Sequence, residues 1–233
     1  MERQIKSEWL DSLPPDDASA IRSRLDLRRV NAWMGHARLL AHTLRSAANG
    51  RPLQTLVELG AGDGHFLLQV ARRLNPPATG GRVLLLDRLS LVNAETEAAL
   101  RQTGWHIEPT QGDVFEWLRL AGSGPVDAVM ANLFLHHFTN DQLRELLCLA
   151  ARRASVVVAV EPRRSLLARI FSRLLWAIGC NSVTRHDARV SVGAGFAGRE
   201  IAALWPSAAL DRWDLVEKSA GLFSHLFVAK LHR

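Results

Sequence analysis

The sequence predicts an α/β fold in which helices cover both faces of a largely parallel sheet. Short apolar strand patterns alternate with helical patterns from residue 55 to residue 160, as in successive strand–helix–strand units. A glycine-rich loop follows the first of these strands. Two further strand patterns, joined by Ala220-Gly221, end the chain and predict an antiparallel hairpin.

Residues 1 to about 50 are predicted to be helical and to precede the sheet. A break at Pro14-Pro15 comes before a run of apolar residues at helical spacing from Ile21 to Leu44, and Asn49-Gly50 ends that run. Strands are then predicted at residues 55–60, 82–87, 105–109, 126–133, 155–160, 214–219 and 224–231. The helices between them are predicted at residues 64–74, 89–101, 114–120 and 141–153.

An insertion at about 162–196 follows the fifth strand. Its first part, residues 165–178, is amphipathic and predicts one helix. The apolar stripe of that helix comprises Leu166, Leu167, Ile170, Phe171, Leu174, Leu175 and Ile178. The stripe could pack on the core, cover an apolar small molecule bound by the protein, or touch lipid as a peripheral membrane contact. Residues 191–196 are predicted to be a flexible glycine segment.

Composition narrows the class of protein. A chain of 233 residues with 48% hydrophobic and 22% charged residues suits a folded domain with an appendage. Cys148 and Cys180 lie far apart in apolar runs, so we expect no disulfide, no metal site and a cytoplasmic location. We find no signal peptide and no apolar run of the roughly 20 residues that a membrane span needs. The formal charge of +6 permits anionic partners.

The glycine-rich loop is the most informative signal. Gly60, Gly62 and Gly64 follow a buried strand, so a ligand can approach the backbone and the next helix offers free N–H groups. A nicotinamide site would place a third glycine where this chain has His65. Glu58 precedes the loop, and a carboxylate there suits a ligand with an ammonium group rather than a pyrophosphate.

Two acids follow later strands. Asp87 ends the second strand about 20 residues after the loop, where a carboxylate can bind a ribose diol. Asp113 precedes the helix predicted at 114–120. Either acid could instead be a helix cap.

These segments resemble class I S-adenosylmethionine-dependent methyltransferases. VELGAGDGHF resembles the family's first motif, LLLDR its second, GDVF its third, and VDAVMANLFLHHF its fourth-strand motif. The resemblance covers roughly residues 51–233 and implies a Rossmann-like seven-stranded sheet of order 3-2-1-4-5-7-6 with one antiparallel strand. It also implies that residues 1–50 form a helical lid over the acceptor. More loosely, the chain is similar to bacterial methyltransferases encoded near type III polyketide synthases, which belong to secondary metabolism.

The resemblance implies S-adenosylmethionine as the cofactor and assigns roles at matching positions. The methionine part of the cofactor would meet Glu58, Gly60, Ala61, Gly62 and Gly64. The ribose would meet Asp87 and Arg88, the adenine Asp113 and Val114, and the ammonium group the backbone of Asn132.

The acceptor side is predicted from the histidines. A hydroxyl acceptor needs a base, and a histidine of pKa about 6.5 can take its proton. His136 and His137 lie between the fourth strand and the next helix; we expect one to face the acceptor, His136 before His137. Metal binding is not expected, because adjacent side chains should point apart and no acidic ligand set accompanies them. His186 beside Asp187, in a predicted loop, is the rival base.

Five further residues are candidates for the acceptor pocket, although helix core is the favoured alternative for the first three. They are Trp33, Met34, His36, Glu161 and Arg185. The predicted function is therefore O-methylation of a small, apolar molecule, aromatic or polyketide-derived. C- or N-methylation, or a binding protein without turnover, remain alternatives. Nucleic acid is disfavoured because no base-methylating N/D-P-P-Y/F/W motif is present, and the oligomeric state is open.

Overall fold

The computed structural model describes residues 2–78, 80–120 and 124–232. A seven-stranded sheet of order β3-β2-β1-β4-β5-β7-β6 forms its centre, and β7 runs antiparallel to its neighbours β5 and β6. The predicted fold class and strand order are confirmed. The strands are β1 (Thr55–Leu59), β2 (Gly81–Asp87), β3 (Trp105–Gln111), β4 (Val126–Asn132), β5 (Ala154–Pro162), β6 (Trp213–Ala220) and β7 (Ser224–Leu231).

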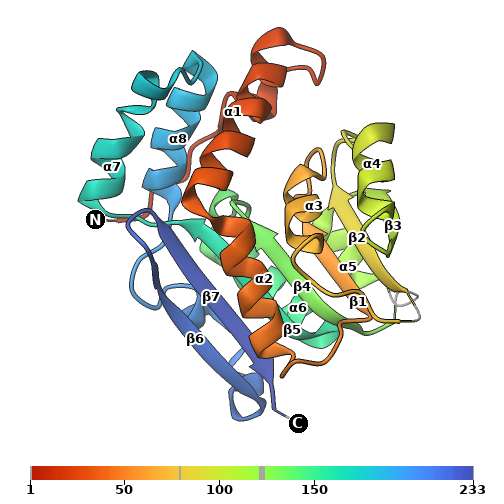
Figure 1. Cartoon of the computed structure of the whole chain (residues 1–233). Helices are drawn as coiled ribbons and strands as arrows, with labels where there is room; N and C mark the ends of the chain where they lie inside the picture. The colour runs from red at the N-terminus through yellow and green to blue at the C-terminus, as the bar shows by residue number, and fades with distance from the viewer. Residues whose placement is uncertain (1, 79, 121–123, 233) are drawn as a thin grey trace.

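Helices cover both faces of this sheet, as Figure 1 shows. They are α1 (Ala18–Met34), α2 (His36–Ala47), α3 (His65–Ala71), α4 (Ala94–Arg101), α5 (Val114–Arg119), α6 (Asn140–Arg153), α7 (Leu166–Ser172) and α8 (Ser182–Ala194). One core cluster joins α2, α3 and α4 to one face of the sheet, and a second joins α5, α6 and residues 196–205 to the other. No helix of the described residues is long and apolar enough to cross a membrane.

Local chemistry explains several element boundaries. The Asp17 carboxylate accepts from two backbone N–H groups and starts α1. Thr139 and Gln142 form a capping box at α6. Gly35 adopts a left-handed conformation with φ of 69° and divides the predicted 21–44 run into α1 and α2, because a left-handed residue ends a helix.

Further predicted elements differ from the structure. Residues 2–13, predicted to be helical, contain only the 3₁₀ turn η1 (Leu10–Ser12). The predicted 89–101 helix begins only at Ala94, where Asn93 supplies the N-cap. The predicted 165–178 helix stops at Ser172 and resumes as the 3₁₀ turn η3 (Leu175–Ile178). The predicted loop around His186 is part of α8, and so is most of the predicted glycine segment 191–196. In each case the residue types suited either conformation, and packing decided between them.

An N-terminal segment (residues 2–13) crosses the molecule at the carboxyl ends of the parallel strands. Its Trp9 ring stacks on His186 of α8 at a centroid distance of 3.8 Å, and Arg3 donates to the backbone oxygens of Ala194 and Phe138. α1 packs against α8, where Thr184 Oγ1 donates to the buried Asp26 carboxylate at 3.3 Å. The N-terminal segment, α1, α7 and α8 thus form one cap beside the sheet (Figure 1).

Candidate cofactor and acceptor site

The loop after β1 has the shape that a close ligand contact requires. Gly60 and Gly62 have φ values of 69° and 55°, which a residue with a side chain rarely adopts. A Cβ on Gly62 would meet nothing within 4 Å, so this glycine faces open space. A Cβ on Gly60 would lie 2.3 Å from the Phe134 ring. The loop therefore has one open side, toward a ligand, and one side closed by an aromatic ring from beyond β4.

Glu58 presents a buried acid to that loop. Its side chain is 2% exposed, and its Oε2 accepts no hydrogen bond from the described residues. Burial raises the pKa of this carboxyl well above its usual range, and the charges of Asp63 and Asp87 add to the shift. A buried carboxylate oxygen without a donor indicates a missing cationic or donor ligand. The ammonium group of S-adenosylmethionine fits this position.

Asp87 lies at the end of β2, beside the loop. Its Oδ2 accepts from Gly62 N–H at 2.8 Å, and its Oδ1 accepts from Leu89 N–H at 2.9 Å. It caps no helix, because α4 begins seven residues later. Each oxygen keeps a lone pair that a ribose hydroxyl can use. Arg88, the next residue, is exposed at the rim.

Asp113 does cap a helix. Its Oδ1 accepts from the backbone N–H groups of Phe115 and Glu116 at the start of α5, so the capping alternative holds for this acid. Gly112 N–H donates to Asp87 O, which brings Asp113 and the buried Val114 to the same edge of the sheet as Asp87. Capping through one oxygen leaves Oδ2 for a ligand. Ala61 and Gly64 are buried in the loop, where Gly64 N–H donates to Ala61 O.

Asn132 ends β4 and is tied to the start of α2. Its Oδ1 lies 2.9 Å from His36 Nδ1, and His36 Nε2 lies 2.6 Å from Ser224 Oγ. Burial lowers the pKa of His36 to about 4, so the neutral ring donates to Asn132 and accepts from the Ser224 hydroxyl. His36 was expected to line the acceptor pocket. Both of its ring nitrogens form hydrogen bonds within the protein, to Asn132 and Ser224, so His36 holds the Asn132 side chain in place.

Glu161 and His136 form a buried pair across the ends of β5 and β4. His136 Nδ1–H donates to Glu161 Oε2 at 2.8 Å, and Glu161 Oε1 accepts from the backbone N–H groups of Phe134 and Leu135. Burial would raise the pKa of Glu161, but these bonds and the His136 charge lower it. Glu161 therefore fixes the turn after β4 and the orientation of the His136 ring.

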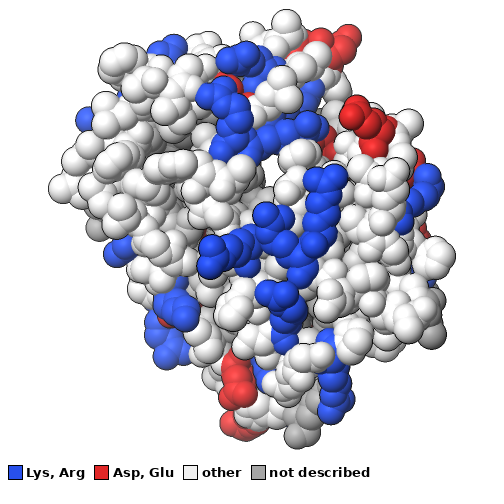
Figure 2. Space-filling model, viewed as in Figure 1, with Lys and Arg blue, Asp and Glu red and all other residues white. Residues whose placement is uncertain are grey.

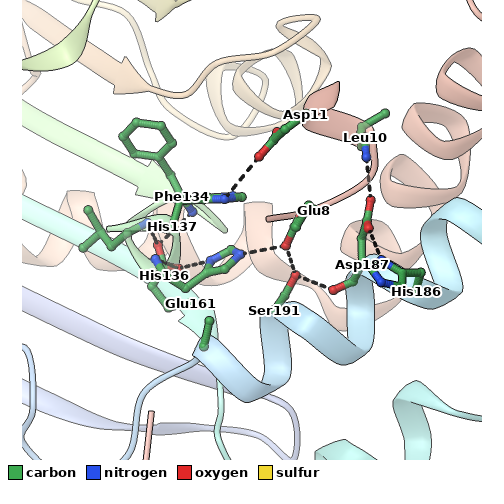
Figure 3. A network of polar contacts seen from close by, with 12 residues as sticks. Glu8, Leu10, Asp11, Phe134, His136, His137, Glu161, His186, Asp187 and Ser191 are labelled. Atoms are coloured by element: carbon green, nitrogen blue, oxygen red, sulfur yellow. Dashed lines mark hydrogen bonds and ion pairs between the residues drawn. The ribbon is translucent and has the colours of Figure 1, made fainter. Parts of the chain in front are cut away.

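Glu8 of the N-terminal segment engages the other side of the same ring. Its Oε1 lies 3.3 Å from His136 Nε2 and accepts from Ser191 Oγ–H. Burial lowers the pKa of His136, but the hydrogen bonds and charges of Glu161 and Glu8 outweigh it and raise this pKa to about 9. Figure 3 shows the row Glu161–His136–Glu8–Ser191. At neutral pH His136 is an imidazolium held between two carboxylates.

His137 differs from its neighbour. Its side chain is 28% exposed, and its Nδ1 lies 3.6 Å from Asp11 Oδ2. Burial and the charge of His136 lower the pKa of His137. Its ring centroid lies 6.5 Å from that of Phe134, which covers Gly60. His137 is therefore neutral at pH 7, and its ring lies near Phe134 and Asp11 (Figure 3).

The expectation that the two histidines point apart, without an acid nearby, is wrong. Their ring centroids lie 4.3 Å apart. Ligand atoms of Glu8, His136 and His137 lie within 4.8 Å of one another, a spacing that a metal ion could bridge. The acid was missed because it comes from a segment 128 residues away in sequence. Both nitrogens of His136 already have carboxylate partners, which accounts for the cluster without a metal.

The rival base serves another purpose. His186 Nδ1 does lie 2.8 Å from Asp187 Oδ1, as a base and its orienting acid would. The Asp187 carboxylate, however, accepts from the backbone N–H groups of Trp9 and Leu10, and the His186 ring is covered by Trp9. This pair therefore anchors the N-terminal segment. The pair lies on α8 rather than in a loop, and it is linked to His136 through Ser191 and Glu8: the Ser191 hydroxyl donates to the Asp187 backbone oxygen and to Glu8 (Figure 3).

The remaining acceptor candidates lie in different places. Trp33 is 71% exposed at the end of α1 and stacks on Phe223 at 5.7 Å. Met34, half-buried, ends the same helix. Arg185 is on α8, where its Nε donates to Asn181 O. Of the five, the structure brings only Glu161 into direct contact with the histidine turn.

α1 also closes on the cofactor loop. Arg28 Nε donates to Asp63 Oδ2 at 3.0 Å, and Arg28 Nη2 lies 2.8 Å from the same oxygen. Figure 2 shows Lys and Arg side chains in a band down the middle of this face, over α1 and α2. Sequence reasoning missed Arg3, Glu8, Asp11, Arg28 and Phe134. No periodicity or motif marks the first four, whereas Phe134 stands inside the quoted fourth-strand motif.

Comparison with known proteins agrees with this geometry. Residues 56–171 match the family model described as a methyltransferase domain. The chain carries a class I S-adenosylmethionine-dependent methyltransferase domain. The family uses S-adenosylmethionine as its methyl donor, and Glu58 and the open side of Gly62 fit that cofactor. No protein of curated function matches the sequence.

Solved structures share the fold of this methyltransferase at low sequence identity. The plantazolicin methyltransferase BamL, in complex with a triazolic desmethylPZN analogue and S-adenosylhomocysteine, matches at TM-score 0.66 and 11% identity, over 95% of this chain and 92% of its own. Magnesium protoporphyrin IX methyltransferase from Synechocystis, bound to S-adenosylhomocysteine, matches at 0.56 and 12%, over 96% and 91%. A Nostoc punctiforme protein provisionally named an O-methyltransferase matches at 0.60 and 16%, over 90% of this chain. The chain spans only 60% of that protein's length.

Proposed function

We propose that this methyltransferase methylates a hydroxyl group of a small, apolar acceptor, aromatic or polyketide-derived, with His137 as the base. The observation that carries the proposal is the pair of unequal histidines after β4. His136 is locked as a cation between Glu161 and Glu8, whereas His137 stays neutral beside the Phe134 ring. The expected order of the two histidines is therefore reversed.

The residues around the loop would divide the cofactor between them. Glu58 would accept a hydrogen bond from the ammonium group of the cofactor, and Asp87 would accept from its ribose hydroxyls. Asp113 would accept from the adenine amino group. Gly62, which has no side chain, would leave room for the methionine part of the cofactor. When bound, S-adenosylmethionine supplies an electrophilic methyl group on a sulfonium centre. The structural relatives named for plantazolicin and magnesium protoporphyrin IX support a small acceptor.

The histidine turn would do the remaining chemistry. His137 would take the acceptor proton as the oxygen attacks, which suits a phenol of pKa near 10. His136 would act as a positioning residue, because its bonds to Glu161 fix the turn that carries His137. The cap would exclude water and hold the acceptor in line, effects that can supply several kcal/mol. We also propose that residues 1–50 act as a helical lid on the domain formed by residues 51–233.

The test measures transfer of labelled methyl groups from S-adenosylmethionine to a panel of phenols and a bacterial lipid extract. His137→Ala should lower kcat at least tenfold, since a general base contributes about 10²–10⁴, and should leave the affinity for S-adenosylhomocysteine unchanged. His42→Ala is the matched control, because His42 is an exposed histidine on α2.

Each result separates one claim. Label in phenols or extracted lipids, lost with His137→Ala, supports the proposal. Label found only in RNA or protein would refute the small acceptor, and unchanged turnover in His137→Ala would refute the base. Failure to bind S-adenosylhomocysteine would remove the methyltransferase assignment itself.

A further inference from the structure

The insertion exposes its apolar stripe instead of burying it. Seven large apolar side chains of residues 166–178 are between 40% and 69% exposed; they are Leu166, Leu167, Ile170, Phe171, Leu174, Trp176 and Ile178. Of the three alternatives for the stripe, packing of the whole stripe on the core does not hold. Soluble proteins seldom leave a contiguous apolar patch of this kind without a partner.

This apolar face extends beyond the insertion. The Phe171 ring lies 4.9 Å from that of Phe223, and Phe223 lies 5.7 Å from Trp33. Leu222, in the same β6–β7 turn, is 56% exposed. Figure 1 shows α7 standing beside α8 and above that turn. The exposed side chains of residues 166–178, together with Trp33, Leu222 and Phe223, form one surface, named here the apolar face.

The charges around the apolar face have one sign. Residues 162–186 contain no aspartate or glutamate and four arginines that are at least partly exposed, at positions 163, 169, 173 and 185; the fifth, Arg164, is buried and pairs with Glu200. Arg22 and Arg29 of α1 reach the η3 end of this segment, where they donate to the Gly179 and Ile178 carbonyls. The part of Figure 2 over α7 and η3 is largely white, with blue side chains at its borders. Apolar side chains ringed by arginines match the interface of an anionic bilayer.

A second copy of the chain fits this surface less well. A symmetric dimer would place the same patch on itself, so the arginine borders of two copies would face each other without acids to pair with. An anionic lipid surface suits both features, because its headgroups can pair with the arginines and its acyl chains can bury the apolar side chains.

The inner end of the apolar face reaches the site. Phe223 precedes Ser224, whose hydroxyl is bonded to His36, and His36 is bonded in turn to Asn132 at the end of β4. The ring contacts of Phe171 with Phe223 and of Phe223 with Trp33 form an apolar row that ends next to this polar group. An apolar acceptor could follow it from a lipid surface to the cofactor.

We propose that the apolar face docks on an anionic lipid surface and that the enzyme collects its acceptor there. The docking stands on the exposed side chains and arginines alone, whereas the collection of the acceptor rests on the proposed function. Docking is peripheral, because η3 and the seven residues of α7 are too short to span a bilayer.

The first test is co-sedimentation of the full chain with vesicles of phosphatidylglycerol and phosphatidylcholine, and with vesicles of phosphatidylcholine alone. We expect binding to the anionic vesicles, weakened by salt, and at least tenfold weaker binding to neutral ones. Ile170→Glu and Trp176→Glu should each reduce binding to anionic vesicles at least tenfold. Leu210→Glu is the matched control, because Leu210 is 46% exposed but lies on η5 (Ser207–Arg212), outside the apolar face.

The results that overturn docking are equally defined. Equal pelleting of the wild type with and without vesicles, or equal loss in the Leu210→Glu control, would refute it. A dimer in light scattering that Trp176→Glu dissociates would assign the apolar face to a second copy. Thermal unfolding and binding of S-adenosylhomocysteine confirm that each variant is folded, which is expected because the replaced side chains are exposed.

The second test concerns the acceptor. Ile170→Glu should lower turnover of a long-chain phenol embedded in anionic vesicles at least tenfold and leave turnover of a soluble short-chain phenol unchanged. Equal turnover of the embedded phenol would refute collection from lipid. If neither phenol is methylated, the proposed function fails, while the vesicle measurement still decides the docking.

Discussion

The replacement Glu58→Gln should make the enzyme more stable and at the same time weaken its hold on the cofactor. Glu58 is 2% exposed, and its Oε2 has no donor among the described residues. An unpaired buried acid costs stability, and replacing it by a neutral group of equal shape should recover about 1 kcal/mol of unfolding free energy. For a chain of this size that corresponds to about 2–4 °C in Tm.

The pH dependence of this gain follows from the raised pKa of Glu58. The folded state holds this proton more tightly than the unfolded state, so the acid is harmless below its unfolded pKa of 4.5. Stability is then lost as pH rises above 4.5 toward the raised folded pKa. The Tm advantage of Glu58→Gln should therefore be absent near pH 4 and present at pH 7.

Cofactor affinity should move the other way. Loss of a hydrogen bond to a charged group costs about 1.5–3 kcal/mol, which is roughly 10–150-fold in the Kd for S-adenosylhomocysteine. Calorimetry measures this Kd, and thermal unfolding measures Tm without ligand.

A second buried glutamate provides the control. The carboxylate of Glu217 is also fully buried, but it accepts from the backbone N–H groups of Ile201 and Ala202 and lies 2.7 Å from His225 Nε2. Glu217→Gln should therefore lower Tm. If Glu58→Gln lowers Tm as Glu217→Gln does, or leaves the Kd unchanged, Glu58 is a structural acid and our account of the loop is refuted.

Three further outcomes are expected. Arg28→Ala removes the ion pair to Asp63 and should speed release of S-adenosylhomocysteine several-fold in stopped flow. Its Tm should change little, because a partly exposed pair contributes at most about 1 kcal/mol. An unchanged release rate would show that α1 does not close the cofactor loop. Because the pKa of His136 is raised to about 9, its ion pairs contribute fully to the free energy of unfolding below pH 6.5, and this contribution is lost as pH rises through 9. Limited trypsin digestion near the N-terminus should therefore accelerate between pH 6.5 and 9. Glu8→Gln should shift this acceleration to lower pH. EDTA should leave methyl transfer unchanged, because His136 already has two carboxylate partners; loss of activity restored by a divalent cation would instead assign a metal to the cluster.

The cofactor side could be predicted because its residues follow one another in short segments. Glu58, Gly60 and Gly62 lie within five positions, and the parallel pairing of β1 with β2 brings Asp87 to the same edge. Local sequence order and strand direction together determine that placement. The strand order itself came from the resemblance, since alternation of strands and helices alone allows several orders.

The acceptor side could be predicted only in part. His136 and Glu161 were both candidates, but their pairing depends on the parallel contact of β4 with β5. Glu8 and Asp11 could not be placed, because the N-terminal segment carries no periodic pattern and reaches the site only in the folded chain. The apolar stripe of residues 165–178 was visible in the sequence, but its periodicity is the same whether the stripe faces the core or the solvent.

Closure of the N-terminal segment and the strength of the proposed base follow from one interaction. With Glu8 in place, His136 keeps its proton, and the positive charge beside His137 lowers the pKa of that ring. Without Glu8, His136 would lose one of its two carboxylate partners, so its pKa would fall. The charge of Glu8 also raises the pKa of His137, against the larger effects of burial and of His136 that lower it. The closed enzyme would thus hold His137 neutral and shielded from water, whereas in the open enzyme water would reach the same ring and its pKa would be nearer the ordinary value. A histidine of ordinary pKa about 6.5 is already mostly neutral at pH 7, so the main effect of the closed segment on the proposed base would be to exclude water from it and to fix its position through His136.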